Sequence, residues 1–168
     1  MLAHQTQAFS ALACAAMLSS VSHLITAQTP AAPTAPQPAP TRSADVSFAT
    51  YDGHPMLGRL TLPADSRRHP VVIYVQSAEG MTRDMRRPLS DSTTFDYMSP
   101  YATRLPEMGV GFFSYEGRGI TGGTRPPRFE TIDSAVFNTS TLENKTRDLL
   151  SAIDVVRKQP GVDPQRIL

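Results

Sequence analysis

The amino-acid sequence predicts an α/β fold in which an antiparallel hairpin is followed by parallel β-α-β-α units. Three observations predict this class. Asp52-Gly53 is a strong hairpin turn signal between two strand-like segments. Pro70–Val75 and Val110–Tyr115 are continuous apolar runs, a pattern typical of strands buried on both faces. A helical pattern follows each run, and strands that alternate with helices favour a mostly parallel sheet.

An uncharged segment precedes the folded part. No Lys, Arg, Asp or Glu occurs before Arg42, although the 168 residues include 16 basic and 15 acidic side chains. Ala8–Ala27 is apolar and rich in small residues, which is typical of a signal peptide that ends at its cleavage site. We therefore predict a signal peptide over residues 1–27 and a periplasmic or secreted protein. A spanning helix is disfavoured because it needs about 20 strongly apolar residues and a basic flank to orient it.

A proline-rich segment separates this leader from the folded part. Thr29–Pro40 is dense in proline and alanine, and proline fixes φ and removes backbone donors. Residues 28–42 are therefore predicted to form an extended, disordered linker, and residues 43–168 the folded domain. The net charge of +1 and the lack of a long basic run argue against a nucleic-acid partner. Nothing beyond the export signal predicts a membrane contact.

The first half of the domain is predicted to begin with the hairpin. Val46–Tyr51 alternates in the manner of a strand, and Leu57–Leu62 returns as its antiparallel partner. The first apolar run then forms the third strand and leads into a long polar loop over residues 76–95. The spacing of apolar residues predicts a helix over Tyr97–Met108, ended by Gly109.

The second half continues from the second apolar run into an irregular loop over residues 116–138. The clearest helix starts at a capping box, Ser140-x-x-Glu143. One apolar face is predicted for it, formed by Leu142, Thr146, Leu149, Ile153 and Val156. Its charged residues, Asp148 among them, are predicted to occupy the remaining surface. Pro160-Gly161 ends the helix, and Ile167-Leu168 begins a further strand.

Three segments of the folded part carry a family pattern. Pro70–Gly80 is an apolar strand with the loop that follows it, and Phe113–Gly119 places an Arg-Gly pair after an acidic residue. Asp148–Leu168 leads from a helix through Asp163-Pro-x-Arg-Ile into a strand. In order and spacing these segments resemble the α/β-hydrolase family, specifically its exported serine-peptidase-like and dienelactone-hydrolase-like branch. The resemblance covers Asp45–Leu168 and implies an incomplete α/β-hydrolase fold, truncated at the onset of the fifth strand.

The resemblance also implies where the catalytic triad belongs. In this family the nucleophile lies on a Gly-x-Ser-x-Gly turn directly after the fifth strand. No serine of this chain has glycine both two positions before and two positions after it; Ser77 and Ser114 both fail. None of the chain's histidines is at a position that matches the triad base: His4, His23, His54 and His69. The nucleophile, the acid and the histidine are therefore expected beyond Leu168.

One catalytic element is implied within the chain. The family takes one N–H donor of its oxyanion hole from the loop after the third strand. The matching positions are Gln76-Ser77-Ala78, with Ser77 where relatives often have glycine. Because the chemistry needs an amide rather than a side chain, the backbone N–H of Ala78, or that of Ser77, is the implied catalytic donor. The alternative is that these residues are simply a loop that leaves a strand.

Two patterns that suggest a cofactor or a metal are rejected. Gly117–Gly122 matches the dinucleotide fingerprint G-x-G-x-x-G, which requires a helix to open at its third glycine. Pro126-Pro127 is incompatible with such a helix, so Arg118 is interpreted as a loop-organising residue. The loop carboxylates have no histidine or cysteine at metal-ligand spacing: Glu79, Asp84, Asp91 and Asp96. We predict no cofactor and no metal.

The sequence thus predicts a partial serine hydrolase that acts on an ester or amide bond of a small-molecule substrate. This chain alone is expected to be inactive, because it contains no triad. The alternative is a non-catalytic exported remnant or a binding module. Solubility separates the two hypotheses, since half of a sheet exposes an unpaired edge and a soluble, well-folded monomer favours the binding module. The pattern predicts neither the substrate nor the oligomeric state.

Overall fold

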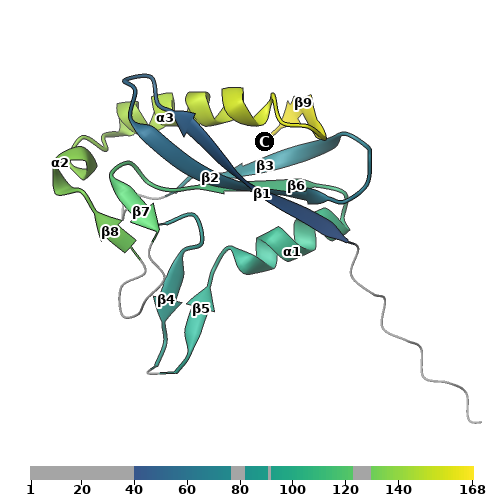
Figure 1. Ribbon diagram of the computed structural model, residues 1–168, viewed down its shortest axis with the longest axis horizontal. Helices are drawn as coiled ribbons and strands as arrows, with labels where there is room; N and C mark the ends of the chain where they lie inside the picture. Colours follow the sequence, from purple (N-terminus) through teal and green to yellow (C-terminus); the bar gives the residue numbers. More distant parts are fainter. Residues whose placement is uncertain (1–39, 77–81, 91, 123–129) are drawn as a thin grey trace, which may run out of the picture. The chain divides into compact units, whose positions relative to one another are not determined.

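A mixed sheet of five strands is the central element of the described residues (Figure 1). The computed structural model describes residues 40–76, 82–90, 92–122 and 130–168. The predicted signal peptide and most of the predicted linker lie outside them. The strands follow one another across the sheet in the order β1, β2, β6, β3, β9, with the bounds Thr41–Ala49, Pro55–Pro63, Gly111–Tyr115, His69–Tyr74 and Val162–Ile167.

The strand directions confirm the predicted class. β1 and β2 form an antiparallel hairpin and β2 is antiparallel to β6, whereas β3 is parallel to both of its neighbours, β6 and β9. Gly53 takes the positive φ of +82° in the predicted turn. The hairpin begins at Thr41 rather than at the predicted Val46, so it starts within the segment expected to be linker. The earlier start of β1 is explained by its backbone pairing with β2, which extends to Thr41. These hydrogen bonds join main-chain groups, so they form whether or not the side chains are apolar.

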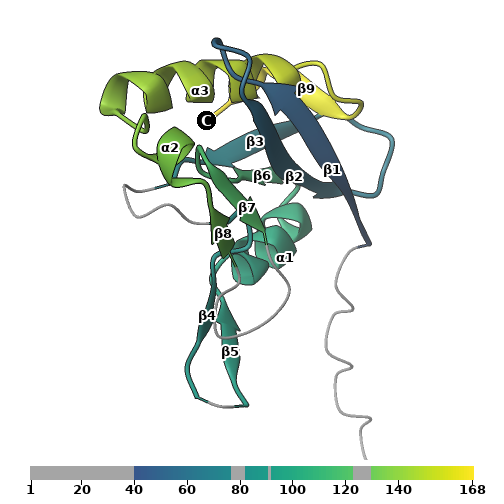
Figure 2. The same ribbon diagram turned by 60° about the vertical axis from the view of Figure 1, so that its left-hand side comes forward.

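Two helices cover opposite faces of the sheet (Figures 1 and 2). The helices α1, α2 and α3 have the bounds Ser99–Glu107, Ser134–Phe137 and Leu142–Val156. Tyr101 of α1 stacks on Phe112, with ring centroids 5.8 Å apart, whereas Val156 of α3 packs in the cluster that contains Phe113. Because successive side chains of a strand point to opposite faces, the two neighbouring phenylalanines place α1 and α3 on opposite sides.

The hydrophobic core lies between the sheet and α3. Leu60, Phe113 and Ile73 are side by side on adjacent strands, and Phe113 is fully buried. A Cβ on Gly58 would lie 2.2 Å from the ring of Phe113, so the ring occupies the space that a larger residue would need. Full burial of one such side chain contributes about 1.5–3 kcal/mol.

The structure corrects two predictions for α3. Its N-cap is Thr141, whose hydroxyl accepts a backbone N–H of the first turn, and not Ser140. Three residues of the predicted apolar face pack against the core, Leu149, Ile153 and Val156, whereas Leu142 and Thr146 are exposed. Asp148 was predicted on the exposed surface and is buried. The physical reason is tertiary pairing with Arg118, which the apolar periodicity of a helix does not reveal.

Both predicted loops contain short strands. The pairs are β4 with β5 and β7 with β8, with the bounds Arg86–Pro88, Thr94–Asp96, Ile120–Gly122 and Glu130–Ile132. These strands are largely polar and three residues long, so no alternation marks them in the sequence. The two apolar runs also differ. β6 is buried along its whole length, as predicted, whereas alternate residues of β3, including Val72 and Tyr74, are only half-buried.

Candidate functional site at the carboxyl ends of β3 and β6

A crevice lies where β3 and β6 end. From β3 the chain crosses one face of the sheet through α1 to reach β6. From β6 it crosses the other face through α3 to reach β9, on the far side of β3. The strand order therefore reverses between these two adjacent strands. In open α/β sheets a ligand binds at such a switch point, outside the carboxyl ends of the strands.

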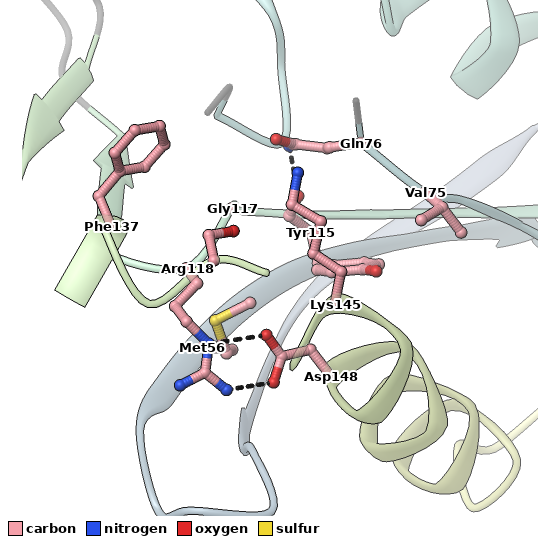
Figure 3. A pocket seen from close by; sticks show the side chains of 10 residues that line it. Met56, Val75, Gln76, Tyr115, Gly117, Arg118, Phe137, Lys145 and Asp148 are labelled. Carbon is pink, nitrogen blue, oxygen red and sulfur yellow. Dashed lines mark hydrogen bonds and ion pairs between the residues drawn. The ribbon is translucent and has the colours of Figure 1, made fainter. Parts of the chain in front are cut away.

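A small pocket of about 20 Å³ lies in this crevice, which is room for a single water molecule (Figure 3). Its walls come from the ends of β3 and β6, from α2 and from α3. Its lining includes Val75, Gln76, Tyr115, Phe137, Lys145 and Asp148. The pocket thus combines apolar walls with a phenol, an ammonium group and a carboxylate.

Gln76 links the end of β3 to Thr82 and to the end of β6. Its buried side-chain amide donates to the carbonyl of Tyr115 at the end of β6, at 2.5 Å, and to the carbonyl of Thr82, at 2.9 Å. The two residues that flank positions 77–81 are therefore joined to each other and to the sheet. The predicted oxyanion donors Ser77 and Ala78 belong to this loop and lie outside the described residues, so their role stays a prediction.

Tyr115 presents a hydroxyl group at the pocket. Its side chain is buried, with 4% of the residue exposed, and its hydroxyl makes no hydrogen bond to another described residue. Burial, together with the negative charge of Asp148, raises the pKa of Tyr115 to about 12. The phenol is therefore a neutral hydrogen-bond donor at any physiological pH. Sequence analysis missed this group because an aromatic residue in an apolar strand reads as core.

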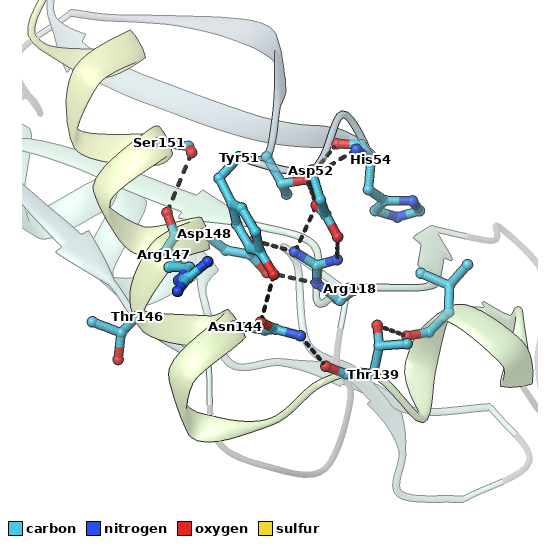
Figure 4. A network of polar contacts seen from close by, with 12 residues as sticks. Tyr51, Asp52, His54, Arg118, Thr139, Asn144, Thr146, Arg147, Asp148 and Ser151 are labelled. Carbon is cyan, nitrogen blue, oxygen red and sulfur yellow. Dashed lines mark hydrogen bonds and ion pairs between the residues drawn. The ribbon is translucent and has the colours of Figure 1, made fainter.

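Arg118 joins three segments of the chain behind the pocket (Figure 4). Its guanidinium group donates to both oxygens of Asp148 on α3, at 3.0 and 2.5 Å. It also donates to both oxygens of Asp52 in the hairpin turn, at 2.6 and 3.1 Å. We call these three residues the Arg118 clamp. The predicted loop-organising role of Arg118 is confirmed by these contacts, and its two acidic partners are the residues that sequence analysis missed.

The charged groups of the clamp are paired with one another. The side chains of Arg118 and Asp148 are only 2% and 3% exposed, whereas Asp52 is 39% exposed. The hydrogen bonds from Arg118, and then that from Thr50, hold the pKa of Asp52 well below its usual range. Hydrogen bonds to Asp148 and Asp52 likewise raise the pKa of Arg118. Because two carboxylates occupy both edges of the guanidinium group, we interpret Arg118 as a residue that positions the walls of the crevice.

The hairpin turn is also attached to α3 through Tyr51. Its hydroxyl donates to the side-chain oxygen of Asn144 at 2.7 Å (Figure 4). The guanidinium group of Arg147 lies over the Tyr51 ring, 4.6 Å from its centroid. These contacts and the clamp fix the turn against the helix that forms one wall of the pocket.

The glycine-rich segment after β6 adopts no dinucleotide-binding geometry. Gly122, the third glycine of the motif, lies in strand β7 and donates its N–H to Glu116 at 3.0 Å, whereas the fingerprint places this glycine at the start of a helix. Arg83 donates to the same carboxylate at 3.0 Å. Burial raises the pKa of Glu116 above its usual range, against the effect of these contacts. Gly119 has a φ of +71°, and a Cβ there would lie 2.6 Å from the backbone nitrogen of Phe137.

The two histidines of the described residues have structural contacts. His69 begins β3, at the opposite end of that strand from the crevice, and its ring nitrogens contact Gly109 and Asp65 at 3.0 and 2.6 Å. The Nε2 atom of His54 accepts a long hydrogen bond of 3.4 Å from Gly119. Within the described ranges, no three side chains of the metal-binding types cluster, and no helix is long and apolar enough to cross a membrane.

Comparisons with known proteins give matches among solved structures. No family model matches the sequence, and no curated protein does. One similar structure is a dienelactone hydrolase-like promiscuous phosphotriesterase from metagenomic libraries, with 16% identity, a TM-score of 0.48, and coverage of 76% of this chain and 47% of that one. An α/β hydrolase from Penicillium sp. sh18 has 25% identity and a TM-score of 0.47, with coverage of 75% and 36%. An acetyl xylan esterase from Paenibacillus sp. R4 has 18% identity and a TM-score of 0.47, with coverage of 76% and 40%.

The chain spans less than half of the length of each of these three proteins. They are hydrolases and esterases, and the protein is similar to them in fold at low sequence identity over about 76% of its length. The α/β class of the protein itself rests on its strand order and on the helices that cover both faces of its sheet.

Proposed function

We propose that this chain supplies the oxyanion-binding side of an exported serine hydrolase that acts on ester or amide bonds. The observation that carries the proposal is the pair of hydrogen bonds from the side chain of Gln76. Gln76 follows β3 at the switch point of the sheet, and its amide donates to the carbonyl of Thr82 and to that of Tyr115. An oxyanion hole requires backbone amides that are positioned before the reaction, and hydrolases of this fold take one of them from the segment that follows the third strand.

The proposed chemistry is acyl transfer. A serine would attack the carbonyl carbon, a histidine would accept the serine proton and return it to the leaving group, and an acid would orient the histidine. The oxygen of the attacked carbonyl becomes negative in that step, and the N–H of Ala78 would donate to it. The chain contains no Gly-x-Ser-x-Gly turn, so the proposal assigns the nucleophile to residues beyond this sequence.

Substitution of the proposed donor tests this role in the complete gene product. Ala78→Pro removes the backbone N–H, and we expect kcat for p-nitrophenyl butyrate to fall by about 10²–10³, the usual effect of losing one oxyanion donor. Ala78→Gly keeps the N–H and is the matched control, expected to stay within a few-fold of the parent. Ser77→Pro, measured in parallel, shows which of the two amides donates.

Two results would overturn the proposal. The first is a gene product that neither hydrolyses the ester nor reacts with a fluorophosphonate, which labels activated serines; that result favours the binding module. The second is an equal loss of activity in Ala78→Gly and Ala78→Pro, which would mean that loop shape and not the amide matters. Export is tested separately: intact-mass measurement of protein from the periplasm or medium should place the mature amino terminus at Gln28.

A further inference from the structure

We propose that a second site, on the α1 side of the sheet, binds a small neutral ligand with several hydroxyl groups, such as a polyol or a sugar. A cleft of about 160 Å³ lies there between the sheet, the start of α1 and the β4–β5 hairpin, on the side of the sheet seen facing α1 in Figure 2. It is separate from the crevice at the carboxyl ends of β3 and β6, and the proposal does not depend on the hydrolase function.

The sheet presents two polar rows to this cleft. Ser43 is paired with Thr61 across β1 and β2, and their hydroxyl groups are hydrogen-bonded at 2.9 Å. In the next row on the same face, Arg59 is paired with Ser114 across β2 and β6. All four residues line the cleft. A sheet face that lies under a helix is ordinarily apolar, so this concentration of polar groups needs an explanation.

Ser114 is the residue that points to a ligand. Only 4% of it is exposed, yet its hydroxyl makes no hydrogen bond to another described residue. Among the described residues only Nε of Arg83 is a fully buried side-chain polar atom without a partner, so the hydroxyl of Ser114 is reached from the cleft. Because Ser114 lines the cleft and its hydroxyl has no partner among the described residues, a polar group in the cleft can form a hydrogen bond with it.

The charges of the cleft favour a neutral ligand over an ion. Arg59 donates to Asp45 at 2.9 Å and to Asp84 at 3.0 Å. Asp96 accepts the backbone N–H groups of Met98 and Ser99 at the start of α1, both at 3.0 Å. Arg86 lies 3.7 Å from both Asp84 and Asp96, so each charged residue of the lining has a partner of opposite charge. Carboxylate acceptors beside guanidinium and hydroxyl donors instead suit a ligand whose hydroxyls both donate and accept.

The volume sets the size of the ligand. A cavity of 160 Å³ corresponds to about five water molecules at roughly 30 Å³ each. A ligand of that size carries a few hydroxyl groups on a short carbon chain or a single ring. It would displace several waters and keep hydrogen bonds to Ser114, Thr61 and the charged pairs.

Amide NMR titration of the 168-residue chain tests the proposal, with glycerol and D-ribose as probes. We expect both to shift the signals of residues around the cleft, such as Thr61 and Ala102, in a saturable way. Ser114→Ala should weaken the affinity by about tenfold, the effect of losing one good hydrogen bond, and should leave the fold intact because the hydroxyl has no protein partner. Ser151→Ala, at a half-buried position of α3 that does not line the cleft, is the matched control and should leave the affinity unchanged.

Two further probes complete the experiment. 1-Butanol has a similar size and one hydroxyl, and inorganic phosphate is an anion; neither should saturate the cleft. The proposal is overturned if neither polyol gives saturable shifts, if Ser114→Ala binds as tightly as the parent, or if 1-butanol or phosphate binds as well as glycerol. The first result means that the cleft holds only water. The other results mean that its hydroxyl groups do not select the ligand.

Discussion

The two faces of the sheet differ in the side chains that β2 and β6 present to them. On the α3 side, paired positions of β2 and β6 hold Leu60 and Phe113, which are buried in the hydrophobic core. On the α1 side, the neighbouring pair is Arg59 and Ser114. The two sets alternate along the strands, so consecutive residues occupy a core position and a polar position. The comparison teaches that the α3 side carries the main hydrophobic core, whereas the α1 side combines Phe112, buried under Tyr101, with polar positions.

The largest effect is expected on the apolar face. Phe113→Ala removes a fully buried ring and should lower the free energy of unfolding by about 3–5 kcal/mol. The adjacent Ser114→Ala, on the other face, should change it by no more than about 0.5 kcal/mol. Urea unfolding of both variants, followed by circular dichroism, measures the difference. Equal losses in the two variants would show that the α1 side contributes to stability as much as the core does.

The next effect concerns the charged group on the α3 side. Arg118→Met leaves the buried carboxylate of Asp148 without its partner and should cost about 3 kcal/mol, the lower end for breaking a buried pair. The double variant Arg118→Met/Asp148→Leu replaces the pair with apolar side chains and should recover most of that loss. A double variant as unstable as the single one would mean that the clamp stabilises through its geometry and not through charge pairing.

The smallest effect is a pH dependence of stability in the acid range. The pKa of Asp52 is lowered in the folded state, chiefly by the hydrogen bonds from Arg118. Its contribution is therefore complete above the unfolded-state pKa of about 3.9 and is lost as the pH falls from there through the lower folded-state pKa. Asp52→Asn should be less stable than the parent near neutral pH, and its stability should fall less steeply below about pH 4.

Urea midpoints measured at several pH values between neutral and strongly acidic give the slopes. Asp65 and Asp163 also have lowered pKa values, because each accepts hydrogen bonds from a neighbouring arginine, Arg67 and Arg166 respectively. These groups leave a residual slope in Asp52→Asn. Parallel curves for the parent and the variant would contradict the assignment of the acid-range slope to the clamp.

The parts of the fold that local sequence could predict are those that local physics determines. The Asp52-Gly53 turn, the two apolar runs and the alternation of strands with helices were all readable, because each depends on neighbouring residues. The partnership of Arg118 with Asp148 was not readable, since 30 residues separate them and a charged residue on a helix ordinarily faces water. Sequence analysis missed the short strands β4, β5, β7 and β8, because each has three residues and depends on pairing with its neighbour. None of them is long enough to show a sustained alternation of apolar and polar residues.

The sequence predicted the position of the candidate site in the fold but not all of the side chains that line it. The order of elements already placed a loop after the third strand at the functional end of the sheet, and the structure adds that the side chain of Gln76 donates to the carbonyls of Thr82 and Tyr115. The hydroxyl groups of Tyr115 and Ser114 could not be found from the sequence. Each lies in a strand whose residues are all buried, and only the geometry shows that the hydroxyl lacks a protein partner.

The Arg118 clamp has a consequence for the order of folding events. Its contacts join residues 66 and 30 positions apart in the chain, so the hairpin, β6 and α3 must all be in place before it can close. Closing it earlier would bury a charge without its partner. The clamp should therefore form after the transition state, and weakening it should accelerate unfolding while leaving the folding rate nearly unchanged. The main effect of the clamp is therefore expected on the unfolding rate, and so on the lifetime of the folded state.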